Sequence, residues 1–426
     1  MNDPSPLAEI ERIVQERARE LALDTDGDAG ALVGLVREAV EQWSVDHKRG
    51  VRSFDLAEPD RIVDRAVRNL TGYGPLAPLL ADDDVWEIMI NGPTEVFAKR
   101  HVGSSGYHDE VFHDDEHVTR TLTKILEDAS AAHRKLDPTE GLQDAQLDDG
   151  SRLHIVHGDV GRGGHTIVNI HKFSHVAFND LDQLVERGML EPGPAAFLAG
   201  CVQARTSIVF AGAPGSGKTT LLSCCCAALD PSLRVVVAEE VFEADVPLPN
   251  VASMQTRPAR GDREAIDLRR LVSGFLRMAP DIAIVGEVRD REALPLLLTL
   301  SSGVKGFTTL HAGSARQALT RLRFVCQLDR DLPLSALNTL VTEAIDLVVH
   351  CARTPHGPRV TEIVAVEDLA GGPDTAQFTT TPVFGRERPD APLRWSGQVP
   401  VRLEHALADA GVDLRTALGS REGGPR

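Results

Sequence analysis

The stretch from Gly212 to Thr219 reads GAPGSGKT, in which two glycines, a lysine and a threonine follow the spacing G-x-x-x-x-G-K-[ST], and a third glycine lies between them. Glycines let backbone N–H groups curl around an anion, and a lysine supplies a point charge to phosphate oxygens. The apolar run TSIVFA precedes the stretch and a helical pattern starts at Lys218, so the helix dipole adds positive potential. This pattern predicts a phosphate-binding loop of a nucleotide-binding protein. The residues assigned to phosphate binding are Gly212, Gly215, Ser216, Gly217, Lys218, Thr219 and Thr220, and the hydroxyl of Thr219 is also a candidate Mg²⁺ ligand.

Hydrolysis of a nucleoside triphosphate also needs a carboxylate that holds the metal or orients the attacking water. The apolar run DIAIVGEV carries Glu287 at its end, where strands of a parallel sheet face the ligand crevice, so Glu287 is predicted to activate water. Gly286 precedes it where an aspartate is usual, so another group must help with the metal. The run RVVVA ends in Glu239 and Glu240, which are costly beside each other unless a cation or an arginine faces them.

A single histidine, His311, lies in GFTTLHAGS, at the end of the next apolar run. A lone histidine is more often structural than catalytic. Its place after a strand that follows the phosphate loop and both carboxylate runs favours a nucleotide-linked role, as a sensor of the γ-phosphate and not as the base. Gly303 and Gly306 are expected to let this loop shift between states.

Arginines form a third group of candidates. Arg257, Arg277 and Arg289 lie near the expected strand ends, and Arg152 and Arg162 lie in the N-terminal part of the chain. A guanidinium can clamp a phosphate with two hydrogen bonds, so one or two of them are candidates to reach a nucleotide from a neighbouring domain or subunit. Taken singly, each is more often a surface or ion-pairing residue.

The phosphate loop lies in a region where strands and helices alternate. Between residues 186 and 385, the runs TSIVFAG, RVVVAE, DIAIVGEV and GFTTLHA are separated by helical patterns such as DLRRLVSGFLRM. This alternation predicts an α/β domain with a parallel-rich sheet and helices on its faces, followed by a hairpin across TPHGP. We expect residues 176–185 to be a linker and residues 386–426 to be a loosely attached C-terminal tail.

The N-terminal part has a different pattern. Residues 1–55 carry helical periodicity in LAEIERIVQERARELAL and AGALVGLVREAVEQW, which predicts a helical N-terminal segment. Residues 56–175 combine the expected strand pair DVWEIMING and TEVFAKR, a helix in EHVTRTLTKILEDASAAH, and two β-rich runs around a glycine loop. They are predicted to form a smaller α+β domain.

Bulk composition limits the functions that are plausible. With 426 residues, 42% apolar residues and 25% charged residues, the chain is that of an ordinary globular protein of two or three domains. A formal net charge of −18 and only 4% aromatic residues disfavour nucleic acid as a partner, although a local basic channel is compatible with them. The acidic, polar N-terminus and the lack of a run of eighteen apolar residues predict a cytosolic protein. The six cysteines show no paired metal-binding spacing, so they are expected to be small buried thiols.

Together, GAPGSGKTTLL, VVVAEEVFEADV, IVGEVRDREAL and GFTTLHAGSARQALTRL resemble the motifs of type II and type IV secretion ATPases, most closely of the branch that assembles Tad/Cpa-type pili. The resemblance extends to GYGPLAPLLADDDVWEIMINGP, QDAQLDDGSRLHIV and NVASMQTRPARG, and so covers about residues 60–365. It implies a hexamer in which each subunit has an N-terminal domain and a RecA-like ATPase domain with ATP and Mg²⁺ between them. It also implies an inner-membrane platform as partner, and therefore a peripheral place at the inner face of that membrane.

The resemblance also assigns residue roles. Glu239 and Glu240 correspond to the aspartate box, where one or the other supports the metal and the attacking water, and Glu240 is the candidate metal ligand. Glu287 corresponds to the Walker B glutamate and His311 to the histidine box, and these four residues are the catalytic candidates. Glycine before that glutamate, here Gly286, is common in the family. Arg152 and Arg162 resemble N-domain arginines that approach the nucleotide, so both arginines are nucleotide-binding candidates.

The chain also departs from the family at several positions. Val304 stands where the family often has a histidine and His171 where it often has an arginine, while Ser273 and Ala279 replace frequent arginines. An imidazole cannot copy the two-pronged grip of a guanidinium. The resemblance implies an ATP-hydrolysing motor that powers pilus assembly or type II/IV secretion. Two other hypotheses remain: a DNA-translocating or conjugation-type ATPase, and a non-hydrolysing scaffold gated by nucleotide.

Overall fold

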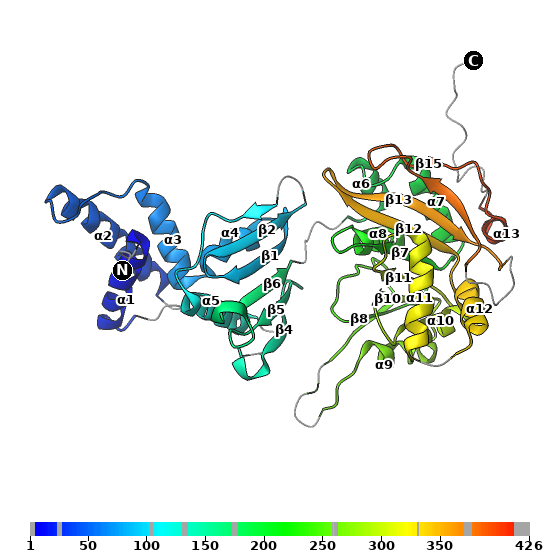
Figure 1. The fold of residues 1–426 in the computed structure, drawn as a ribbon, viewed down its shortest axis with the longest axis horizontal. Helices are drawn as coiled ribbons and strands as arrows, with labels where there is room; N and C mark the ends of the chain where they lie inside the picture. Colours follow the sequence, from blue (N-terminus) through cyan, green and yellow to red (C-terminus); the bar gives the residue numbers. More distant parts are fainter. Residues whose placement is uncertain are drawn as a thin grey trace, which may run out of the picture. The chain divides into compact units, whose positions relative to one another are not determined.

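The computed structural model of the chain describes residues 5–23, 28–101, 105–129, 135–172, 178–257, 259, 263–329, 332–369 and 377–412. The chain divides into two compact units, residues 1–175 and 176–426, which are described separately below (Figure 1). Among the described residues, no helix has both the length and the apolar character needed to cross a bilayer.

Three helices open the first unit: α1 (Pro6–Glu20), α2 (Ala29–Lys48) and α3 (Pro59–Thr71). The first begins with Ser5, whose side chain accepts a hydrogen bond from the backbone of Ala8, and with a proline at its first position. Apolar residues at helical spacing, such as Ile10, Val14 and Val36, are completely buried where the three helices pack together. The helical segment predicted for residues 1–55 thus extends in the structure to a third helix that shares its core.

The rest of the first unit is a six-stranded antiparallel sheet with the order β3-β2-β1-β6-β5-β4. Its strands are β1 (Val85–Gly92), β2 (Glu95–Arg100), β3 (Gly106–Tyr107), β4 (Leu142–Gln146), β5 (Arg152–Val156) and β6 (Ile167–His171). The helix α5 (Asp115–Asp128) accompanies it, together with the short elements η1 (Gly74–Leu76), α4 (Ala77–Ala81), η2 (Pro138–Glu140) and η3 (Arg162–Gly164). Strand residues that alternate inward, including Ile88, Ile90 and Ile170, pack against Leu122 and Ile125 of α5, so one face of the sheet forms the core.

The second unit is built on a nine-stranded sheet with the order β15-β14-β13-β12-β7-β11-β10-β8-β9. The pairs from β9 to β12 are parallel and the remaining pairs are antiparallel. Its strands are β7 (Ile208–Gly212), β8 (Val235–Glu239), β9 (Val251–Gln255), β10 (Ile282–Val288), β11 (Lys305–Leu310), β12 (Leu347–Thr354), β13 (Gly357–Val366), β14 (Thr380–Gly385) and β15 (Arg394–Trp395). The predicted parallel-rich sheet and the hairpin across TPHGP are therefore confirmed.

Helices cover both faces of this sheet, as Figure 1 shows. On one face lie α6 (Leu181–Glu186), α7 (Pro192–Gln203), α8 (Lys218–Cys226) and α13 (Val401–Asp409). On the other lie α9 (Leu268–Val272), α10 (Ala293–Ser301), α11 (Ala315–Asp329) and α12 (Leu334–Ala344), with the 3-10 helix η4 (Phe275–Met278) after α9. Because strands β7, β8 and β10 are buried from both sides, they are nearly continuous apolar runs and do not alternate; Glu239 and Glu287 stand near the carboxyl ends of β8 and β10. The order of the strands places the carboxyl ends of β8, β10, β11 and β7 side by side.

Two sequence expectations need correction in this unit. The helix expected over DLRRLVSGFLRM is broken: α9 ends at Val272, and Ala279 after η4 has a left-handed backbone with φ of 50°. The segment expected as a loose tail is attached as far as residue 412, because Leu393, Leu403 and Leu407 are buried in the same core as α7 and α8. Its Pro and Gly content was misleading, since three well-spaced leucines suffice to anchor it. Residues 413–426 lie outside the described residues.

Candidate functional site

The phosphate loop follows β7 directly and ends where α8 begins, as its motif predicts. Gly217, the residue before the helix, has a left-handed backbone with φ of 83°, a conformation that side chains other than glycine rarely adopt. The loop is held from β12, whose Arg353 donates a hydrogen bond of 3.0 Å to the Gly215 carbonyl. The hydroxyl of Ser216 is fully buried and has no hydrogen-bond partner in the described part of the chain. A loop with a free hydroxyl and a helix N-terminus fits a phosphate group.

Lys218 lies within the loop that it is expected to serve. Its side chain is buried, and its Nζ donates a 2.9 Å hydrogen bond to the carbonyl of Ala213. Burial lowers the pKa of the Lys218 ammonium, and the negative charge of Glu287 opposes that effect. Thr219 and Thr220 follow on the first turn of α8 and are half-buried.

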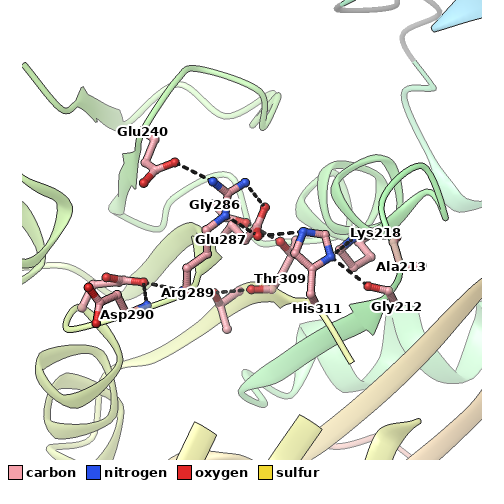
Figure 2. A network of polar contacts seen from close by, with 12 residues as sticks. Gly212, Ala213, Lys218, Glu240, Gly286, Glu287, Arg289, Asp290, Thr309 and His311 are labelled. Atoms are coloured by element: carbon pink, nitrogen blue, oxygen red, sulfur yellow. Dashed lines mark hydrogen bonds and ion pairs between the residues drawn. The ribbon is translucent and has the colours of Figure 1, made fainter. Parts of the chain in front are cut away.

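His311 connects the phosphate loop to the carboxylate of the neighbouring strand (Figure 2). Its Nδ1 lies 3.1 Å from the carbonyl oxygen of Gly212 and 3.4 Å from Nζ of Lys218, and its Nε2 lies 2.9 Å from Oε1 of Glu287. This contact is possible because β11, which ends just before His311, pairs with β7 on one side and β10 on the other. The structure therefore brings the phosphate loop, His311 and Glu287 together in one network of polar contacts.

An irregularity in β10 sets the direction of the Glu287 side chain. The register between β10 and β11 shifts between Val285 and Glu287, so Gly286 is an extra residue, and Thr309 of β11 donates a 2.7 Å hydrogen bond to its carbonyl. A β-bulge of this kind redirects the side chain that follows it. Gly286 is also required sterically, because a Cβ there would lie 2.7 Å from Cγ of Glu239. The aspartate that is missing before Glu287 would collide with Glu239.

Arg289, two residues further on, makes a bidentate contact with the carboxylate of Glu287. Its Nε lies 2.6 Å from Oε1 and its Nη2 2.9 Å from Oε2 of Glu287, and its Nη1 donates a 3.0 Å hydrogen bond to Glu240 (Figure 2). Burial alone would raise the pKa of Glu287, but the hydrogen bonds from His311 and Arg289 outweigh it and lower this pKa to about 2. The same pair raises the pKa of Arg289.

Sequence reasoning grouped Arg289 with the arginines that are singly unremarkable, and so missed its place in this network. A signal was available: acidic residues at two neighbouring strand ends, Glu240 and Glu287, called for a facing cation or arginine. Arg257 instead donates to the carbonyl of Glu264, 3.1 Å away, and Arg277 lies in η4.

Glu239 has a different environment from Glu240. It is buried, and its Oε1 accepts hydrogen bonds from the backbone N–H groups of Glu243 and Ala244, at 3.1 and 2.9 Å. Glu239 therefore fixes the loop after β8, whereas Glu240 is half-exposed and contacts Arg289. The catalytic roles of both glutamates, and the metal role of Glu240 and Thr219, stay predictions.

Several other predicted residues can be placed in the structure. Arg152 and Arg162 belong to the first unit, on β5 and η3, and their role in nucleotide binding stays a prediction. His171 lies on β6, where its Nδ1 is 2.9 Å from Oε2 of Glu87. The expected hinge at Gly306 is wrong: this residue is buried within β11, where a Cβ would lie 1.8 Å from the carbonyl oxygen of Ala283. The glycine is needed for close strand packing and not for movement.

A parallel sheet that carries a phosphate loop after one strand and carboxylates at the ends of its neighbours defines a RecA-like domain of the P-loop class. The family model described as "Type II/IV secretion system protein" matches residues 69–372. The chain belongs to this family, that of the type II/IV secretion ATPases. The matched range includes the sheet of the first unit and the whole polar network of the second.

Named relatives agree with this assignment. A Mycobacterium tuberculosis protein named "Putative conjugal transfer protein" is 32% identical over 311 residues, which are 71% of this chain and 86% of that protein. The Bordetella bronchiseptica type IV secretion system protein PtlH homolog is 31% identical over 301 residues, 64% of this chain and 87% of that protein. Among solved structures, the VirB11 ATPase from the Brucella suis type IV secretion system, in complex with sulphate, is 25% identical. It matches 68% of this chain and 94% of its own, with a TM-score of 0.35.

Proposed function

We propose that this chain is an ATP-hydrolysing motor of a secretion or pilus system. The observation that carries the proposal is the network in which Lys218 of the phosphate loop, His311 and Glu287 contact one another across three neighbouring strands. An NTPase needs a phosphate cradle, a group that responds to the γ-phosphate and a carboxylate that handles the attacking water, in one place. The contacts Lys218–His311 and His311–Glu287 supply that connection.

In the proposed reaction, Glu287 accepts a proton from water while the water oxygen forms a bond to the γ-phosphorus and the bond to the β–γ bridging oxygen breaks. Lys218 offsets negative charge on the phosphates, and His311 transmits their presence to Glu287. The residues present fit a Mg²⁺ ion, since Thr219 can supply a hydroxyl oxygen. When bound, the ion neutralises phosphate charge.

The finer assignment rests on the motif resemblance described above. We propose a homo-hexamer that works on an inner-membrane platform. Pilus assembly of the Tad/Flp type is the favoured role, and type II or type IV secretion is the alternative role. In this proposal the chain lies at the cytoplasmic face of the membrane and reaches it through its partners. Arg152 and Arg162 are proposed to approach the nucleotide from the first unit.

The experiment that tests the motor is ATP turnover by the purified chain and by its Lys218→Ala variant. Loss of the lysine charge should reduce turnover by about 10²-fold or more, because the phosphates lose a charge partner in a confined site. Arg316→Gln, on the exposed face of α11, is the matched control and should retain turnover. Equal rates for Lys218→Ala and the native chain would disprove the assignment, and no turnover in the native chain would favour the nucleotide-gated scaffold.

A conjugation-type ATPase is the second candidate, because a relative at 32% identity carries a conjugal transfer name. If this chain moves DNA, double-stranded or single-stranded DNA should stimulate its turnover, and the stimulation should fall steeply with salt. The net charge of −18 and the few aromatic residues argue for the absence of such stimulation.

A further inference from the structure

Both oxygens of the Glu287 carboxylate are engaged by side chains. Oε1 takes contacts from Nε of Arg289 at 2.6 Å and from Nε2 of His311 at 2.9 Å, and Oε2 takes one from Nη2 of Arg289 at 2.9 Å. A two-pronged guanidinium–carboxylate pair is among the strongest side-chain contacts. With three contacts on its two oxygens and its charge offset by a guanidinium, this carboxylate is a weak proton acceptor while the grip lasts.

A second acceptor for Arg289 is already within reach. Its Nη1 lies 3.0 Å from Oε2 of Glu240, which comes from the end of β8 and not from β10. The Arg289 and Glu240 side chains are each nearly half-exposed, at 46% and 48%, whereas that of Glu287 is 23% exposed. The guanidinium therefore has room to move toward Glu240, while Glu287 does not have room to follow.

The backbone at Arg289 is fixed, so this movement needs only the side chain. The buried carboxylate of Glu292 accepts hydrogen bonds from the backbone N–H groups of both Arg289 and Asp290, the second at 2.8 Å. These bonds hold the turn between β10 and α10. Rotation about side-chain bonds is faster and less costly than a change of backbone.

We propose that Arg289 is a positioning residue that moves between two carboxylates. On Glu287 its guanidinium is a clamp that blocks the base; on Glu240 it leaves Oε2 of Glu287 free for water while His311 still holds Oε1. The inference rests on the proposed role of Glu287 in hydrolysis. It gives Glu240 the task of receiving the arginine, in place of the metal role that the sequence suggested.

The charged groups around this pair come from three elements and lie on two sides of it. Lys218 of α8 and His311 after β11 lie on the side of the phosphate loop, and Glu240 and Glu243 after β8 lie on the side of Arg289. Lys218 on one side repels the Arg289 guanidinium, and Glu240 and Glu243 on the other side attract it. The charges around the pair therefore favour movement of Arg289 toward Glu240.

The test compares the steady-state kinetics of four proteins: the native chain, Glu240→Gln, Arg289→Gln and the double variant. Without the Glu240 charge, Arg289 stays on Glu287, so Glu240→Gln should lower kcat on the order of fivefold with KM nearly unchanged. Arg289→Gln should keep kcat at or above the native value. The double variant should behave like Arg289→Gln, because without the Arg289 guanidinium the charge of Glu240 has nothing to draw away from Glu287.

Three controls separate this mechanism from other roles. Arg291→Gln changes an exposed arginine of the same turn and should leave kinetics unchanged. Arg289→Lys retains charge without the two-pronged grip and should lie close to Arg289→Gln. The Mg²⁺ concentration that gives half-maximal rate should be the same for Glu240→Gln and the native chain, and thermal melting should show that each variant folds.

Two results would overturn the inference: a double variant as slow as Glu240→Gln, or an Arg289→Gln variant that loses turnover although it melts normally. A raised Mg²⁺ requirement in Glu240→Gln would return Glu240 to metal binding and also reject the inference. Failure of the proposed function looks different, because the native chain and Lys218→Ala would then turn over ATP equally.

Discussion

Two clusters of charged side chains lie at opposite edges of the parallel part of the second unit's sheet. At the carboxyl ends, Glu287 is held by His311 and Arg289, the contacts shown in Figure 2. At the amino ends, Asp346 accepts from Lys305 at the start of β11 and from Arg402 of α13, each at 2.8 Å. Both clusters pair a partly buried carboxylate with two basic side chains, so their composition does not distinguish them.

The difference lies in what else these side chains contact. Asp346 also accepts the backbone N–H of Ser207, and Arg402 donates to the carbonyls of Thr342 and Ile345, so this cluster ends on backbone groups. In the cluster at Glu287, His311 reaches the backbone carbonyl of Gly212, but the carboxylate itself is held by side chains, and Arg289 continues to a second carboxylate, that of Glu240. A carboxylate tied to backbone stabilises the fold, whereas one held by side chains is free to change partners. This distinction predicts opposite responses to mutation.

The largest expected effect is that of Glu287→Gln on turnover. An amide cannot accept the proton from water, so kcat should fall by about 10²- to 10⁴-fold. ATP binding, followed with a fluorescent analogue, should stay within about twofold because Lys218 and the loop are intact. A normal rate of hydrolysis in this variant would remove Glu287 from the role of base.

Next in size is the effect of Asp346→Ala on stability. The change leaves Lys305 and Arg402 without their shared carboxylate and the N–H of Ser207 without an acceptor, so unfolding in urea should require about 3 kcal/mol less free energy. Turnover at low temperature should be close to native. Asp346→Asn retains an oxygen for Ser207 and should lose less stability; if it instead abolished turnover with little change in stability, the two clusters would not differ as described.

The smallest effect concerns pH. The pKa of Glu287 is about 2 in the folded chain, below its usual value of 4.5, so its contacts contribute stability above pH 4.5 that is lost as the pH falls toward 2. On lowering the pH to about 3.5, the native chain should lose about 1 kcal/mol more stability than Glu287→Gln, which has no proton to take up there. Parallel pH profiles of the two urea midpoints would show that the contacts to His311 and Arg289 are weak in solution.

Local motifs in the sequence were sufficient for much of the site. The loop around Lys218 was predictable because the demands of a phosphate cradle on the backbone leave few choices of residue. The positions of Glu287 and His311 followed from one rule, that carboxyl ends of parallel strands share an edge. The fold class followed from the alternation of buried strands and helices.

Other parts of the site depended on contacts between distant segments. Nothing local shows that Gly286 forms a bulge against β11, or that glycine is required there because the side chain of Glu239 on the adjacent strand β8 occupies the space. The attachment of residues 386–412 also escaped prediction, because a few leucines in a Pro- and Gly-rich stretch give no periodic signal.

By itself, the sequence determined which chemical groups this protein has and at which strand ends they stand. The reason is that backbone geometry and hydrophobic pattern depend on residues that are close together in the chain. Only the tertiary structure decided their pairing. The strand order places β11 between β7 and β10, so His311 reaches both Gly212 and Glu287. It also places β8 beside β10, so Arg289 reaches Glu240. Partners in such networks are chosen by distances between segments far apart in the chain, to which no local pattern responds.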